Sequence, residues 1–409
     1  MVVYVKIIVG VDMKKLKIAM FMDSWYPDIN GVILVMDNLI KHLNKIADVT
    51  LVVPKMTKND DDSIYPFKVI RVDSIPVITT TYKMGLVDLE YLKLRKVFKN
   101  LDLDIIHIHS PFGLGRLGIR VAKEKKIPVI ATMHTRWEFE FKKYLKSNTI
   151  AHIGVKFLIK SYNKCHSCIA LNESLEKVYT DYGYKGKFKI IHNGTDLETI
   201  KNEKKTLERV NNLFRLKNED TVFLFVGRII SIKNIFFILD VLKELKERNF
   251  SFKMIYVGDG PDYEALSKKI NDYNLNNDVI MAGKIMDREL LKAIYYRANL
   301  FLFPSLFDSS SLVQIEAASQ MTPTIFVEGA VTADTVTNNI NGFTAKENVL
   351  DFANRIEEII KNKKLYNKVQ TGAKRDLARP WSEIAKETYD YYLEVIDDYQ
   401  KKNIVKQEK

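Results

Sequence analysis

Short apolar runs alternate with longer stretches of mixed apolar and polar residues along almost the whole chain. Runs such as KIAMFM (17–22) and DVTLVV (48–53) have the length of one buried strand, and segment 32–43 between them has helical spacing. Strands of a parallel sheet read as continuous apolar runs because helices cover both faces. The alternation therefore predicts an α/β fold in which parallel strands lie between layers of helices.

The pattern runs through one series, is interrupted by a charged stretch at 201–209, and restarts at residue 223. The first series has further strands predicted at 67–72, 104–109, 128–134, 167–171 and 189–194, with helices at 90–99, 115–125 and 174–181. The second series has strands predicted at 223–228, 252–258, 278–283, 300–305 and 323–327, with helices beginning near Ser231, Asp262, Asp287 and Ser311. We predict two Rossmann-like domains, 1–200 and 201–381, and a last helix, 382–402, that can pack on either domain.

Composition narrows the class of protein. The chain has 409 residues, of which 46% are apolar and 28% charged, as in soluble globular proteins. A net charge of +12 favours an anionic partner, which can be a phosphate ligand, a nucleic acid or an acidic membrane. Nucleic acid is the weakest of these, because the charge is spread over two α/β domains and no nucleic-acid module is recognisable.

The apolar runs and the cysteine content bear on the cellular location of the protein. No apolar run approaches the ~18 residues that span a bilayer, so we expect no transmembrane helix. The only cysteines, Cys165 and Cys168, exclude a disulfide scaffold and favour a reducing cytoplasm. The first twelve residues lack a signal-peptide cleavage site and are interpreted as an extension before a start near Met13.

Two facing α/β sheets enclose a cleft, and ligands bind at the carboxyl ends of the strands. In the first domain, Gly31 stands at a strand-to-helix turn where free N–H groups can face a phosphate, although taken alone the loop favours a simple turn. His134 ends the strand 128–134, where a functional and a structural histidine are equally plausible. His107 and His109 face the same side of one strand, but they lack a third ligand for a metal.

Candidate anion-binding residues follow the strands of the second domain. Arg228 ends a strand, and Lys233 is predicted in the first turn of the helix that Ser231 would cap. A cation there opposes the helix dipole, which favours a role in binding diphosphate over a role in stability. Gly258 lies in the glycine-rich turn VGDGP (257–261), which can be only a tight connection.

The segment FDSSSLVQIE (307–316) places two acids eight residues apart around a serine-rich turn that opens a helix. Backbone N–H groups at Ser310, Ser311 and Leu312 can face a phosphate. Asp308 and Glu316 can accept hydrogen bonds from sugar hydroxyls, although an ordinary capped helix with an exposed Glu has the same spacing.

A basic and aromatic stretch, 136–164, holds seven Lys or Arg residues against two Glu. A basic amphipathic helix with aromatic residues can lie on an anionic membrane, whereas a cleft-side helix with one wet face fits as well. The residues proposed to contact acceptor or membrane are Trp137, Lys142, Lys143, Lys146, Lys156 and Lys160.

Taken together, these motifs resemble the family-4 retaining glycosyltransferases of the GT-B fold. The resemblance is carried in order by NGV (30–32), DIIHIHSPFGLG (104–115), the ATMHT histidine, HNGTD (192–196), VGR…KN, VGDGP and FDSSSLVQIE. It implies that the last helix returns to the first domain. It further implies that Arg228 and Lys233 bind a diphosphate near Gly31, that Glu316 binds the ribose and Asp308 the donor sugar, and that His134 lies near the reacting sugar.

Three departures from the family pattern bear on the donor sugar. Position 308 is Asp where the family usually has Glu, Ser309–Ser311 replaces a Gly-containing loop, and Asn30-Gly31 replaces a Gly pair. The chemistry that the resemblance implies is transfer with retention, requiring neither metal nor cofactor. The pattern is similar to bacterial enzymes that glucosylate diacylglycerol, so we expect a UDP-sugar donor and a lipid acceptor at the inner face of the cell membrane. A transferase for cell-wall or capsule glycans, a nucleotide-sugar epimerase and a non-catalytic binder remain alternatives.

Overall fold

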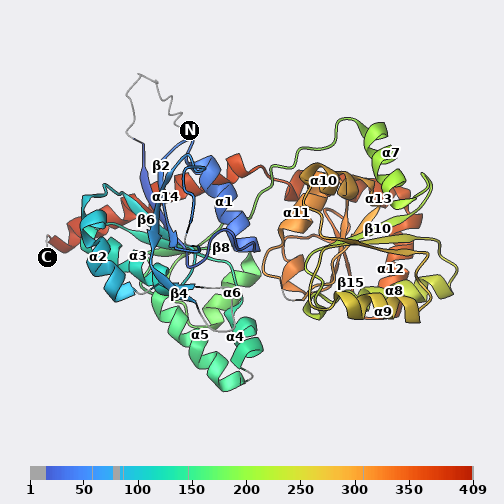
Figure 1. The fold of residues 1–409 in the computed structure, drawn as a ribbon, viewed down its shortest axis with the longest axis horizontal. Helices are drawn as coiled ribbons and strands as arrows, with labels where there is room; N and C mark the ends of the chain where they lie inside the picture. Colours follow the sequence, from blue (N-terminus) through green and yellow to red (C-terminus); the bar gives the residue numbers. More distant parts are fainter. Residues whose placement is uncertain are drawn as a thin grey trace, which may run out of the picture.

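The computed structural model describes residues 15–407 apart from 58, 77–82, 86, 146 and 307. Figure 1 shows two parallel sheets side by side, each covered by helices on both faces. The first sheet has seven strands in the order β3-β2-β1-β6-β7-β8-β9, and the second has six in the order β12-β11-β10-β13-β14-β15. This is the predicted architecture of two Rossmann-like domains.

The strands of the first domain are β1 (Lys17–Phe21), β2 (Asp48–Pro54), β3 (Lys68–Val72), β4 (Ser74–Pro76), β5 (Lys83–Gly85), β6 (Ile105–Ile108), β7 (Val129–Met133), β8 (Ser167–Ala170) and β9 (Phe188–Ile190). Its helices are α1 (Gly31–Leu43), α2 (Val87–Asn100), α3 (Gly113–Lys125), α4 (Trp137–Leu145), α5 (Asn148–Tyr162) and α6 (Glu173–Asp181).

The strands of the second domain are β10 (Val222–Val226), β11 (Lys253–Val257), β12 (Val279–Gly283), β13 (Leu300–Leu302), β14 (Thr324–Val327) and β15 (Phe343–Ala345). Its helices are α7 (Glu203–Phe214), the short 3₁₀ turns η1 (Ser231–Lys233) and η2 (Val331–Ala333), α8 (Ile235–Glu247), α9 (Tyr263–Asp272), α10 (Arg288–Arg297), α11 (Leu312–Ser319), α12 (Val349–Lys361) and α13 (Lys363–Leu377). The last helix is α14 (Trp381–Gln407).

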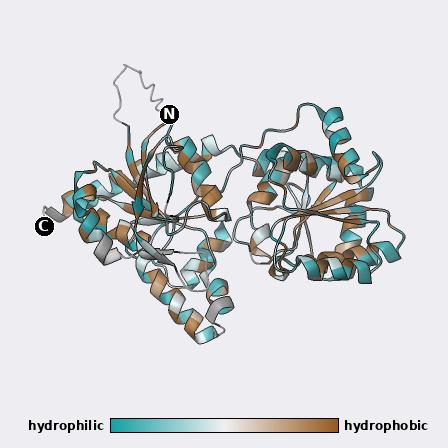
Figure 2. Ribbon diagram, viewed as in Figure 1, coloured by the Kyte–Doolittle hydropathy of each residue, from teal (hydrophilic) through white to brown (hydrophobic). Residues whose placement is uncertain are grey.

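Apolar side chains are buried on both faces of each sheet, which explains the unbroken apolar runs in the sequence. In β1, Ala19 and Phe21 join one core cluster, whereas Ile18 and Met20 join another on the opposite face. Figure 2 shows this as hydrophobic strands between helices whose outer surfaces are hydrophilic. Burial on both faces fixes each strand in the sheet interior, so the loops at the carboxyl ends carry the variable chemistry.

Two local expectations about the second domain were wrong or incomplete. Ser231 does not cap a helix; it begins the 3₁₀ turn η1, and α8 begins only after Asn234, which has a φ of 61°. Lys233 therefore precedes the helix instead of lying in its first turn. The short strand β15 was not predicted, since three residues carry too little pattern to stand out.

The chain crosses between the domains twice, and the two crossings run side by side. Thr195 forms an isolated parallel bridge with Pro380, and the Asp196 carboxylate accepts a hydrogen bond from the Trp381 N–H at 3.3 Å. The other oxygen of Asp196 lies 2.7 Å from His42 Nε2 on α1. After this crossing α14 packs along α1, so that the last helix of the chain covers the first domain (Figure 1).

Candidate active site

The domains meet through the loop that follows β13. The Arg136 guanidinium donates to the Leu306 carbonyl at 3.2 Å, and the Asn172 side chain donates to the Ser309 carbonyl at 2.7 Å. Asn193 also donates to Ser310 Oγ at 3.0 Å. Because these first-domain residues follow the carboxyl ends of β7, β8 and β9, the carboxyl edges of the two sheets face each other across the loop.

The entrance of α1 offers an open approach to its backbone. Asn30 is the N-cap, and its side-chain oxygen accepts hydrogen bonds from the N–H groups of Val32 and Ile33, each at 3.0 Å. A Cβ built on Gly31 would meet no heavy atom within 4 Å, so space lies open above this residue. Gly31 is exposed at the start of α1, where the first N–H groups of a helix are available for hydrogen bonds from outside the helix.

Three histidines lie together where β6 and β7 end. His107 is buried between Tyr392 and Thr132, with 2.7 Å from Nδ1 to the tyrosine oxygen and 2.7 Å from Nε2 to the threonine oxygen. His109 Nδ1 lies 3.0 Å from Nε2 of His134, which is partly exposed. Burial lowers the pKa of all three rings, that of His134 to about 3, so they are neutral at pH 7.

In the histidine pair considered as a metal site, both ring nitrogens of His107 and Nδ1 of His109 contact other side chains. Among the residues that the structure describes, no three His, Cys, Asp or Glu side chains gather as metal ligands would. His107 instead ties α14 to the first sheet through Tyr392, and His109 contacts the candidate active-site residue His134.

Lys233 and Asp308 come from different loops and meet at the carboxyl ends of β10 and β13. The ammonium lies 2.7 Å from both carboxylate oxygens, and Ser305 Oγ donates to one of them at 2.7 Å. The side chains of Lys233 and Asp308 are only 16% and 21% exposed. Arg228, by contrast, follows β10 with its side chain exposed. A partly buried ammonium and an exposed guanidinium, on the loop that follows β10, are side chains of the kind that bind phosphate.

Gly258 has a packing reason to be glycine. Its φ is 142°, and a Cβ placed there would lie 1.8 Å from the Gly227 carbonyl oxygen. The turn after β11 therefore presses directly against the turn after β10, which carries Arg228. Glycine at position 258 therefore allows this close contact with the turn that carries Arg228.

The serine-rich turn leads into α11 without a side-chain cap. Ser311 is buried, and its hydroxyl makes no capping hydrogen bond, while Leu312 packs against the apolar core of the first domain. Further along α11, the carboxylate of Glu316 accepts hydrogen bonds from Arg288 at 2.9 Å and from the Tyr295 hydroxyl at 3.1 Å. Glu316 is thus held in one orientation and is not the exposed side chain that an ordinary surface helix would carry.

The basic and aromatic stretch folds into two packed helices, α4 and α5, which project from the first domain (Figure 1). Trp137, proposed from the sequence to contact acceptor or membrane, is buried, and its ring packs edge-on against Phe112 at 4.9 Å. It belongs to the core, because it anchors the start of α4. Lys142 is partly exposed and pairs with Glu138 at 2.5 Å. Lys146 and the side chain of Lys143 lie outside the described residues.

One face of α5 is apolar and exposed to solvent. Ile150, Ile153 and Phe157 are 53%, 62% and 55% exposed, and their spacing of three and four residues places them on one side of the helix. Lys156 and Lys160 are also exposed, one turn apart. Within the described part of the chain, no helix is both long and apolar enough to cross a bilayer. A helix face of this kind suits an interface between water and lipid.

Asp23, which the sequence did not single out, is a buried carboxylate near the carboxyl end of β1. Its carboxylate accepts hydrogen bonds from Ser110 Oγ at 2.5 Å and from the Leu114 N–H at 2.7 Å, so it caps α3 from the loop that follows β1. Burial raises the pKa of Asp23 above its ordinary value. The Leu114 N–H at the start of α3 therefore already has a hydrogen-bond partner within the protein. No local sequence signal links residues 23 and 114.

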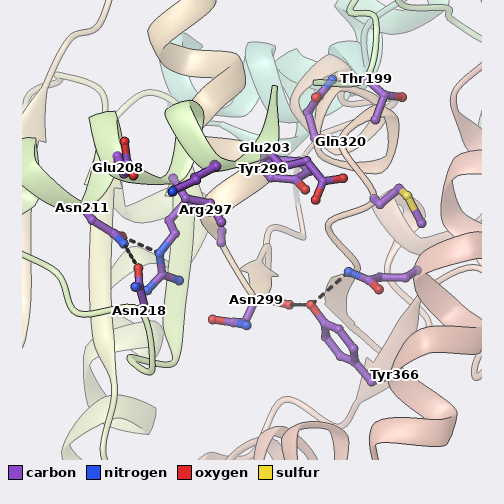
Figure 3. A pocket seen from close by; sticks show the side chains of 15 residues that line it. Thr199, Glu203, Glu208, Asn211, Asn218, Tyr296, Arg297, Asn299, Gln320 and Tyr366 are labelled. Atoms are coloured by element: carbon purple, nitrogen blue, oxygen red, sulfur yellow. Dashed lines mark hydrogen bonds between the residues drawn. The ribbon is translucent and has the colours of Figure 1, made fainter. Parts of the chain in front are cut away.

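A separate cavity of about 710 Å³ lies at the opposite end of the second sheet, lined partly by Asn218 and Asn299, which precede β10 and β13 (Figure 3). Several of its polar groups bond to one another. Arg297 donates to the Asn211 side chain at 2.7 Å, and Tyr366 donates to the Asn299 carbonyl at 2.8 Å. The first bond joins α10 to α7, and the second joins α13 to the residue that precedes β13. Because Asn218 and Asn299 lie at the amino ends of their strands, the cavity is set apart from the carboxyl ends.

Comparison with known proteins agrees with this arrangement. The model for Glycosyltransferase Family 4 matches residues 29–199, and the model for Glycosyl transferases group 1 matches residues 208–376. The chain is 25% identical to the alpha-monoglucosyldiacylglycerol synthase of Acholeplasma laidlawii, over 95% of this chain and 99% of that one. It is 26% identical to the enzyme of the same name from Streptococcus pneumoniae, over 76% of this chain and 70% of that one.

Solved structures support the fold. The crystal structure of Anabaena HepE with UDP and glucose superposes with a TM-score of 0.72 at 15% identity, covering 92% of this chain and 99% of the other. A sucrose-phosphate synthase from Thermosynechococcus elongatus gives the same TM-score at 18% identity, with 94% and 100% covered. With both domains matched by family models and the GT-B architecture in place, the chain belongs to the family-4 and group 1 glycosyltransferases.

Proposed function

We propose that this glycosyltransferase moves a hexose, glucose in the first instance, from a UDP-sugar to diacylglycerol at the cytoplasmic surface of the cell membrane, with retention at the anomeric carbon. The observation that carries the proposal is the similarity to two monoglucosyldiacylglycerol synthases, one of them over nearly the entire length of both chains. The solved relatives that hold UDP support a uridine donor.

In the proposed reaction, the diphosphate lies against Arg228 and Lys233 and approaches the Gly31 N–H. The bond between the sugar C1 and the phosphate oxygen breaks, and a bond from C1 to the acceptor oxygen forms on the same face. The acceptor proton passes to the departing phosphate oxygen, so UDP leaves. The ammonium and guanidinium stabilise the negative charge that grows on that oxygen.

The remaining assignments concern the sugar and ribose. Glu316, fixed by Arg288 and Tyr295, retains lone pairs with which to accept hydrogen bonds from ribose hydroxyls. Asp308 holds Lys233 in the absence of donor and accepts hydrogen bonds from the sugar when the diphosphate takes over the ammonium. His134 lies on the facing domain and contacts the sugar from there.

The exposed face of α5 formed by Ile150, Ile153 and Phe157 supports the proposal that the acceptor lies in a lipid surface. Three exposed large apolar side chains on one helix side are unfavourable in water and insert readily between lipid headgroups. Lys156 and Lys160 and the net charge of +12 add attraction to anionic lipids.

The test is UDP release from UDP-glucose, measured with vesicles that contain or lack diacylglycerol, followed by NMR of any new glycolipid. We expect release that depends on diacylglycerol and a product with the α configuration of the donor. A β-linked product would exclude retention. Release without lipid product would indicate another acceptor, and conversion of the UDP-sugar without any acceptor would indicate an epimerase.

A further inference from the structure

We infer that His109 is a positioning residue that fixes the tautomer of His134, so that His134 presents its Nδ1–H to the cleft as a neutral hydrogen-bond donor. The contact that suggests this is the 3.0 Å separation between His109 Nδ1 and His134 Nε2. The two rings also stack, with centroids 5.3 Å apart and planes inclined by 24°. The role of this donor toward a sugar hydroxyl rests on the proposed function.

The direction of the hydrogen bond follows from the other nitrogen of His109. His109 is buried, and its Nε2 has no hydrogen-bond partner among the described residues. A proton on this nitrogen would be a buried donor without an acceptor, which proteins strongly avoid, whereas an unused lone pair costs less. The proton of a neutral His109 therefore belongs on Nδ1, which then donates to His134 Nε2.

This assignment leaves one arrangement for His134. Because its Nε2 accepts the hydrogen bond, the proton of the neutral ring is on Nδ1. No described residue occupies Nδ1, and the ring is partly exposed. His134 therefore offers a donor and no free lone pair, which suits it to hold a hydroxyl oxygen and excludes it as a base in this state.

The ring of His109 is itself held in place by its neighbour. His107 is bonded at both nitrogens, to Tyr392 and to Thr132, and its ring centroid lies 4.0 Å from that of His109. The backbone N–H of His109 also donates to the Phe21 carbonyl at 2.9 Å. The donor atom is thus fixed by β1, β6, β7 and α14 together, as a positioning role requires.

The tautomer can be observed directly by long-range ¹H–¹⁵N NMR of protein labelled with ¹⁵N in its seven histidines, without any substrate. The signals of His134 are identified by their loss in His134→Gln. We expect the Nδ1–H tautomer in the native protein. In His109→Phe, which keeps a ring and removes the donor, we expect the proton to move predominantly to Nε2, the position that an unconstrained neutral imidazole prefers.

Two further variants separate the hydrogen bond from the packing. Asn at position 109 places an amide N–H near the original Nδ1, so His109→Asn should retain the native tautomer, whereas Gln reaches the Nε2 position and should not. This pair also decides the question if His109→Phe does not fold. His152→Gln, on the exposed face of α5, should leave the His134 signals unchanged.

Activity gives a second readout. We expect kcat to fall about tenfold in His109→Gln and to recover in His109→Asn, with KM for the acceptor unchanged. An Nε2–H tautomer in the native protein, or the same tautomer in all position-109 variants, would overturn the inference. A native Nδ1–H tautomer that depends on residue 109, in a protein that transfers no sugar, would support the positioning role and count against the proposed function.

Discussion

Replacing Lys233 by Met removes the ammonium that we assign to the departing diphosphate while keeping an unbranched side chain of similar length. The structure sets the scale of the effect, since the ammonium lies 2.7 Å from the partly buried carboxylate of Asp308. We take the same distance for the phosphate oxygen. At this distance, and with an effective dielectric constant of about 20, a full unit of charge is stabilised by about 6 kcal/mol. Donor binding already uses part of this attraction, and only the additional charge in the transition state affects kcat.

If about half a unit of charge develops on the phosphate oxygen, the loss is about 3 kcal/mol, or roughly a hundredfold in kcat. The assay is the rate of UDP release at saturating donor. Lys243→Met, on the exposed surface of α8, is the matched control and should keep the native rate.

The variant also leaves the Asp308 carboxylate with Ser305 as its remaining hydrogen-bond partner among the described residues. We therefore include the double variant Lys233→Met with Asp308→Asn, which also removes the negative charge that Lys233 no longer neutralises. If the double variant regains native activity, Lys233 serves only to neutralise Asp308. A single variant with near-native kcat would likewise refute the assignment.

Three further predictions follow from the geometry. Asp23→Asn keeps one of the two acceptor oxygens of Asp23 and removes its titration. Because burial raises the folded-state pKa of Asp23 above 3.8, the unfolding free energy of the native protein should fall relative to that of the variant as pH rises above about 4. Equal pH dependence of the two proteins in denaturant titrations would contradict this. Gly258→Ala should lower the free energy of unfolding by about 1–3 kcal/mol, and with it the Tm, because the new Cβ would lie 1.8 Å from the Gly227 carbonyl oxygen. An unchanged Tm would argue against this packing. Changing Ile153 and Phe157 to Ser should weaken binding to anionic vesicles at least tenfold in a sedimentation assay, since burying each apolar side chain in the membrane contributes about 1.5–3 kcal/mol. Leu213→Ser, at an exposed position of α7, should leave vesicle binding unchanged.

Much of the fold was predictable because the strands are buried on both faces. Each long strand leaves an apolar run, and each covering helix leaves a 3.6-residue pattern, so most elements were located within a few residues. Short elements were not predicted, as with β15 and the antiparallel strands β4 and β5. The basic stretch read as one segment, yet it divides at Ser147, which caps α5 by accepting from the Ile150 N–H.

The candidate residues were visible in the sequence, but their partners were not. Lys233 and Asp308 meet because β10 and β13 are neighbours in the sheet, and consecutive apolar runs do not reveal that order. Asp23 caps a helix 90 residues away, which leaves no periodic signal. Trp137 was misjudged for a related reason, since an aromatic residue in a basic stretch looks the same whether it packs inward or faces lipid.

Transfer of sugar to a membrane lipid can be measured most directly by incubating the pure protein with radiolabelled UDP-glucose and anionic vesicles containing diacylglycerol, then counting the label extracted into organic solvent. We predict label in the organic phase that requires diacylglycerol and falls roughly a hundredfold with Lys233→Met. The absence of extractable label with every UDP-sugar tried, from a folded protein that binds the vesicles, would contradict a lipid acceptor.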